Sequence, residues 1–147
     1  MWNHDRSLLL SLYTVRIFFI AWLIAALSGY FIVEAYTRSL HITDRFLPIL
    51  LAAYGCLIFG LFILLHLHSI LAHIKENQIF IHENVHALRR ISWHCMGIAL
   101  VSFVASIYHL PYLIVCVAFA FVGLIVRIVK NIIAEAIVLK EENDYTI

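Results

Sequence analysis

The chain has 147 residues, of which 64% are hydrophobic and 13% are charged. A soluble globular domain has about 45–50% apolar and about 25% charged residues, and it must expose many of them to water. These values exclude an ordinary soluble fold and predict a single-domain integral membrane protein, residues 1–147, with the lipid bilayer as its solvent. The formal net charge of +1 argues against a concentrated basic face, so we expect no direct nucleic-acid binding.

Four apolar segments follow one another along the chain, and each is near the ~20 residues that cross about 30 Å of hydrocarbon. The residue before a proline avoids helical geometry, so His109-Leu110-Pro111 predicts a tight turn between the last two segments. The expected fold class is all-α, a compact four-helix transmembrane bundle. Its spans are expected at about residues 17–36, 46–67, 92–108 and 111–129.

The cations indicate the orientation of these spans. With the amino terminus inside, the outer loops hold only Arg38 and Arg45, and eight cations lie on the cytoplasmic side. This positive-inside bias predicts that both termini are cytoplasmic. The eight inner cations are Arg6, Arg16, Lys75, Arg89, Arg90, Arg127, Lys130 and Lys140.

Small residues four positions apart recur in every span and predict helix–helix contacts, because they allow close backbone approach. The same faces could join two copies of the chain, so a homodimer is a further expectation. The stripes are Ala21, Ala25 and Gly29; Ala52, Cys56 and Gly60; Ser102 and Ser106; and Cys116, Ala120 and Gly123.

One literal motif suggests metal chemistry. His82-Glu83-Asn84-Val85-His86 matches H-E-x-x-H, in which two histidines of one helix face hold zinc and the glutamate acts as general base. Such a pattern arises readily by chance in a chain with nine histidines. We therefore predict no catalytic residues, metal or cofactor, and keep zinc on His82, Glu83 and His86 as the alternative.

Six histidines gather at the predicted inner face, between the second and third spans. Imidazoles there could respond to pH or bind a transition metal or haem. The favoured interpretation is that they act as amphipathic side chains at the membrane interface. The six are His66, His68, His73, His82, His86 and His94.

Two polar segments lie on the predicted cytoplasmic side. The loop 75–91 contains a short amphipathic helix from about Glu83 to Ile91, and the tail 131–147 ends in acidic residues. We expect the tail to fold back on the loop, with Arg89 or Arg90 facing its carboxylates. The alternative is a solvated tail.

The two segments contain Phe80, Glu83-Asn84-Val85, Leu88-Arg89 and the ending Glu142-Asn143-Asp144-Tyr145-Thr146-Ile147. In these residues the chain resembles a bacterial membrane family, domain of unknown function 2975. The likeness covers nearly the whole chain, and its specific part is the ending E-N-D-x-T-I, with Tyr145 where leucine is usual. Members often look to be encoded beside a small helix-turn-helix regulator, so the resemblance implies a regulator as partner. The residues that carry it, and form a possible interaction surface, include Phe80, Glu83, Asn84, Val85, Leu88, Arg89, Glu142, Asn143, Asp144, Thr146 and Ile147.

The predicted function is therefore a non-enzymatic protein of the bacterial inner membrane. We expect it to sense a signal or to sequester a cytoplasmic helix-turn-helix regulator. One alternative is the zinc metalloenzyme or metal-binding protein described above. The other is a small transporter or immunity-type protein, although the spans lack the paired buried charges and broken helices typical of transporters.

Overall fold

The computed structural model describes residues 4–76 and 78–144 of the chain, with the side chains of 4–8 and 144 left out. These residues form four α helices, one short 3-10 helix and no strand. The all-α fold class is thus confirmed. The elements are α1 His4–Ser39, η1 Thr43–Arg45, α2 Phe46–Lys75, α3 His82–Ala105 and α4 Tyr112–Asp144.

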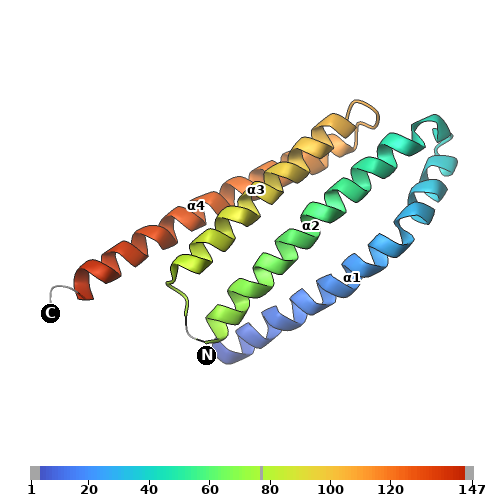
Figure 1. The fold of residues 1–147 in the computed structure, drawn as a ribbon. Helices are drawn as coiled ribbons and strands as arrows, with labels where there is room; N and C mark the ends of the chain where they lie inside the picture. The colour runs from blue at the N-terminus through green and yellow to red at the C-terminus, as the bar shows by residue number, and fades with distance from the viewer. Residues whose placement is uncertain (1–3, 77, 145–147) are drawn as a thin grey trace.

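Successive helices run in opposite directions and pack in chain order (Figure 1). α1 packs on α2, α2 on α3, and α3 on α4. In the described residues, no Cα atom of α1 comes within 8 Å of a Cα atom of α3 or α4, and the same holds for α2 and α4. The helices thus form an open row, and the predicted compact bundle is not confirmed.

The connections divide the molecule into two ends (Figure 1). The start of α1, the α2–α3 connection and the end of α4 lie at one end, which we call the polar end. The α1–α2 and α3–α4 connections lie at the other end, the turn end. The α3–α4 connection is short, as the His109-Leu110-Pro111 sequence predicted.

Three helices are long and apolar enough to cross a membrane, by length and composition. They cover Leu9–Ser39, Thr43–Lys75 and Tyr112–Asn143. Their large apolar side chains are widely exposed, for example Leu27 at 72%, Leu51 at 65% and Ile114 at 75%. Water-soluble monomers rarely expose apolar patches on this scale, so these surfaces indicate a membrane protein.

α3 differs from the other helices because its first turns carry Glu83, Arg89 and Arg90. It lies between α2 and α4, and much of its surface is covered by protein. Several of its buried residues are small or polar: Ser92 donates a hydrogen bond to the Gly123 carbonyl at 2.9 Å, and Ser102 lies 3.6 Å from Cys56 Sγ.

The structure corrects several predicted boundaries. The segment 83–91 is not a separate short helix, because α3 runs without a break from His82 to Ala105. Residues 131–144 are not a loose tail, because they continue α4. α2 likewise extends past residue 67 to Lys75. Continuous i→i+4 hydrogen bonding lets a helix cross from an apolar into a polar sequence without ending.

The predicted small-residue stripes match the observed contacts in part. A Cβ atom at Gly29 would lie 3.3 Å from the Tyr54 hydroxyl, and one at Gly123 would lie 3.1 Å from Cys95 Cβ. A Cβ at Gly60 would meet nothing within 4 Å, so this member of the stripe makes no close contact with another helix of the described chain. The tightest glycine contact, Gly97 against Phe59 at 2.8 Å, was not predicted.

Candidate functional site

The α2–α3 connection at the polar end is held by one buried side chain, Asn84, in the first turn of α3. Its Nδ2 atom donates hydrogen bonds to the carbonyl oxygens of Gln78 and Ile79, both at 2.9 Å. Its Oδ1 atom lies 2.8 Å from Nδ1 of His73, near the end of α2. Asn84 is only 2% exposed, so three hydrogen bonds within one buried site fix the loop against both helices.

This arrangement defines the proton positions on His73. Carbonyl oxygens only accept hydrogen bonds, so the Asn84 amide nitrogen must face Gln78 and Ile79 and its oxygen must face His73. Nδ1 of His73 therefore carries the proton and donates it to Asn84. In the neutral ring Nε2 is then an acceptor.

His66, two turns before His73 on α2, has the same arrangement. Its Nδ1 atom lies 2.6 Å from the carbonyl oxygen of Phe62 and must donate to it. Its neutral ring also presents Nε2 as an acceptor. His94 of α3 lies next to this ring, with 5.6 Å between the centroids, and stacks on Phe62 at 5.2 Å.

Both histidines line a hollow of about 450 Å³ between α2 and α3, which we call the histidine hollow. Six of its seven described lining residues have polar side chains, so it is unlike the apolar surfaces toward the turn end. Arg90 supplies a fixed positive charge, and Glu83 lies seven residues earlier on the same helix. The lining residues are His66, Ser69, His73, Glu83, His86, Ala87 and Arg90.

The end of α4 meets the start of α3 at the polar end. His82 Nε2 lies 3.4 Å from Glu141 Oε1, which is an ion pair when the histidine is protonated. The contact brings the predicted loop and tail together, but it uses His82 where the sequence had suggested Arg89 or Arg90. Ile137 of α4, at 3% exposed, is buried in the same extension.

The family-motif residues take different places. Asn84 is buried and structural, whereas Val85 and Leu88 are half-buried on the same helix. Thr146 and Ile147 lie outside the described residues, and Asp144 ends α4 with its side chain undescribed. The exposed members are Phe80, Glu83, Arg89, Glu142 and Asn143.

The H-E-x-x-H segment occupies the first two turns of α3, but its side chains divide between two neighbours. Glu83 and His86 line the histidine hollow beside α2, whereas His82 contacts Glu141 of α4. Across the described part of the chain, no group of three or more His, Cys, Asp or Glu side chains is placed to hold a metal ion.

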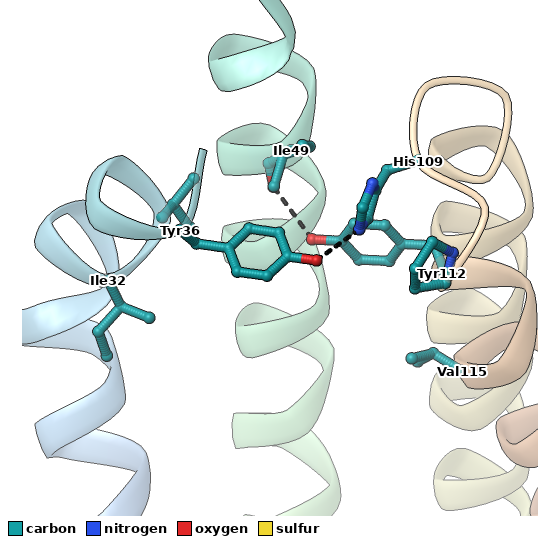
Figure 2. Close-up of a pocket in the computed structure, with 8 residues that line it drawn as sticks. Ile32, Tyr36, Ile49, His109, Tyr112 and Val115 are labelled. Atoms are coloured by element: carbon teal, nitrogen blue, oxygen red, sulfur yellow. Dashed lines mark hydrogen bonds between the residues drawn. The ribbon is translucent and has the colours of Figure 1, made fainter. Parts of the chain in front are cut away.

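A second hollow, of about 240 Å³, lies at the turn end over α2 (Figure 2). Tyr36 reaches across from α1, and its hydroxyl is 2.7 Å from Nε2 of His109. The hydroxyl of Tyr112 donates to the Ile49 carbonyl at 3.2 Å. Ile32 of α1 and Val115 of α4 line opposite sides of the hollow.

These hydrogen bonds have a structural role that the sequence did not indicate. Together with Arg45 Nη1, which donates to the Tyr108 carbonyl at 2.8 Å, they join the α1–α2 hairpin to the α3–α4 connection. An open row of helices has few such lateral links. In the sequence, only the aromatic residues near the predicted outer turns could have indicated these hydrogen bonds. Their positions do not show which residues they bond.

The four helices, three of them long and apolar enough to span a bilayer, and the polar end define the class: an all-helical membrane protein. Within that class, the chain belongs to the family described as protein of unknown function (DUF2975), whose model matches residues 32–147. The match includes both polar segments and all of α2, α3 and α4. No curated protein and no solved structure gives a significant match.

Proposed function

We propose that this protein is a non-enzymatic, four-span component of the bacterial inner membrane. In this proposal it senses a signal or sequesters a small cytoplasmic helix-turn-helix regulator, which docks at the polar end. The observation that carries the proposal is the contact between the start of α3 and the end of α4. It makes one surface from the two segments that also carry the family motif.

The exposed face of α3 supports its assignment as a membrane span, in addition to the three more apolar helices. From residue 93 onward, apolar side chains recur every three or four residues on that face, and each is at least 46% exposed. This spacing marks one helix face, and its apolar character suits contact with lipid. The side chains are Trp93, Met96, Leu100 and Phe103 of α3, with Ile107 in the turn that follows it.

The proposed orientation follows from the cations. Lys75, Arg89, Arg90, Lys130 and Lys140 belong to the segments around the polar end. Only Arg38 and Arg45 lie near the turn end. The positive-inside rule then makes the polar end cytoplasmic.

The proposed docking surface combines an apolar contact with charges of both signs. Phe80 is 47% exposed in the α2–α3 connection, and exposed Arg89 follows two turns into α3. Glu141, Glu142 and Asn143 are exposed at the end of α4. Aromatic and arginine side chains are both enriched in protein-binding surfaces.

The test is binding of the purified protein, in mild detergent, to the helix-turn-helix regulator encoded nearest its gene. We expect Phe80→Ala with Arg89→Glu to reduce binding at least tenfold, since aromatic and arginine anchors commonly contribute about 2 kcal/mol or more each. Deletion of residues 143–147 is expected to weaken binding as well. Asp44→Lys, a charge reversal at the turn end, is the control. Equal binding by all variants, or no binding by the unaltered protein, contradicts the proposal.

A further inference from the structure

The histidine hollow has chemistry that the docking proposal does not use. Its half nearer the turn end is formed by His66 and Ser69 of α2 and by His86 and Arg90 of α3. Glu83 lies about 10 Å farther along α3, at seven residues and 1.5 Å per residue. The sole carboxylate among the described lining residues is therefore two turns away from the arginine, and the half around Arg90 has positive character.

A ligand for this half must both donate and accept hydrogen bonds. Arg90 can only donate, and the Ser69 hydroxyl can donate to an acceptor oxygen. His66 already uses Nδ1 on the Phe62 carbonyl, so in its neutral form it offers Nε2 as an acceptor. A small group that satisfies all three needs anionic oxygens together with an exchangeable proton.

A phosphate monoester meets this requirement. Its second pKa is about 6, so it always carries P–O⁻ oxygens near neutral pH, and about a tenth of it still holds a P–OH proton at pH 7. The hydrogen bond to Nε2 needs one proton, whether the phosphate or the imidazole holds it. A phosphodiester or a sulfate carries no proton of its own at neutral pH, so it can bind Nε2 only when the imidazole supplies the proton. A phosphate monoester can bind either form of the ring.

We propose that the histidine hollow binds a phosphate monoester through Arg90, Ser69 and Nε2 of His66. Two sources carry this group: inorganic phosphate and the headgroup of phosphatidic acid. The apolar run of α2 ends near Leu67, next to His66, so in the proposed orientation the hollow lies at the depth of the inner headgroups. Basic pockets between helices at this depth are suited to lipid phosphates.

The experiment uses the full-length protein in neutral detergent micelles, with no regulator present. Native mass spectrometry compares retention of phosphatidic acid, phosphatidylglycerol and diacylglycerol. Thermal unfolding compares inorganic phosphate with sulfate at equal ionic strength. We expect phosphatidic acid to be retained over the other two lipids, phosphate to stabilise more than sulfate, or both.

Two variants and a matched control assign the effect to the hollow. Arg90→Gln is expected to weaken binding roughly tenfold or more, as for loss of a charge-assisted hydrogen bond, and Ser69→Ala by a smaller factor. The control Arg89→Gln removes the same charge from the neighbouring exposed arginine, which does not line the hollow. It should bind like the unaltered protein.

The outcomes separate the two sources and the two proposals. Phosphatidic acid alone binding identifies a lipid headgroup, and stabilisation by phosphate identifies a site open to free phosphate. Equal retention of phosphatidic acid and phosphatidylglycerol together with equal effects of phosphate and sulfate, or equal losses in Arg89→Gln and Arg90→Gln, overturns the proposal. Because no regulator is present, failure here leaves the docking proposal intact, and failure of docking leaves this one intact.

Discussion

His73 and Asn84 are joined by a hydrogen bond of 2.8 Å between Nδ1 and Oδ1, which links the end of α2 to the start of α3. The same asparagine donates to two carbonyl oxygens of the intervening connection. This hydrogen bond links a histidine of the histidine hollow to a residue of the family motif. Asn84 thus serves mainly to hold the loop and to orient the His73 ring.

Replacement of Asn84 tests this role. Asn84→Ala should lower the free energy of unfolding by about 2–4 kcal/mol, because it leaves buried hydrogen-bonding groups without a partner. Asn84→Asp should be at least as harmful, since it places a carboxylate oxygen against the Gln78 and Ile79 carbonyls. Thermal unfolding in detergent and the rate of proteolysis within residues 75–82 measure the effect. Asn131→Ala, at an exposed position of α4, should be close to neutral.

The α2–α3 contact predicts opposite results at two glycines. A methyl group at Gly97 would lie 2.8 Å from the Phe59 ring, whereas one at Gly60 would meet nothing within 4 Å. Gly97→Ala should destabilise the protein by about 1–3 kcal/mol through overpacking. Gly60→Ala should be neutral or stabilising because alanine has the higher helix propensity. Equal unfolding temperatures for the two variants would contradict the observed packing.

Membrane insertion of α3 is tested on its exposed apolar face. Leu100 is 66% exposed near the middle of the expected span, so Leu100→Asp should cost about 3 kcal/mol in insertion free energy. Val138→Asp is the matched change at a residue of α4 that is 45% exposed and lies beyond its expected span. Protein recovered in the membrane fraction should fall for Leu100→Asp alone. Equal recovery would mean that α3 does not face hydrocarbon.

The proposed orientation is tested by labelling introduced cysteines in intact cells. Glu76→Cys, at the polar end, should react with a membrane-impermeant maleimide only after the cells are permeabilised. Asp44→Cys, at the turn end, should react without permeabilisation. The parent with its three native cysteines is the background control. Labelling of Glu76→Cys in intact cells would place the docking surface on the wrong side and remove the regulator proposal.

The turn after α1 contains a residue in the left-handed region. His41 has φ of 55°, and Ile42 N donates to the Thr37 carbonyl at 3.0 Å, as in a Schellman-type helix end. His41→Gly should stabilise the protein by about 1 kcal/mol, because a Cβ atom is unfavourable in this conformation. Ser39→Gly, at the last residue of α1, should instead destabilise it by up to a similar amount, because it adds backbone freedom and removes the hydrogen bond to the Tyr36 carbonyl. The two unfolding temperatures should therefore shift in opposite directions.

The sequence was sufficient to predict much of the helical architecture. Runs of apolar residues and the turn before Pro111 indicated four helices. The helices α2, α3 and α4 nevertheless continue into polar sequence, at Lys75, His82 and Asp144. Hydropathy reports where a helix leaves lipid, which is a different quantity from where its hydrogen bonding ends.

The candidate site was less accessible to prediction. The cluster of histidines between the second and third spans was recognised, and so was the Glu83-Asn84-Val85 motif. The direction in which each ring nitrogen points depends on Asn84, Gln78 and Phe62, whose contacts are set by the loop path and helix rotation. The H-E-x-x-H spacing likewise could not show that His82 faces α4 while His86 faces α2.

Composition alone was sufficient to predict a membrane protein, because the transfer free energies of apolar side chains add along a segment whatever its neighbours are. Contacts between helices do not add in this way. Gly60 and Gly97 have the same residue type, yet only one meets a neighbouring side chain, since its surroundings depend on the rotation and register of two helices. The open row, the histidine hollow and the Asn84 hydrogen bonds likewise depend on how the helices are placed relative to one another, which only the tertiary structure shows.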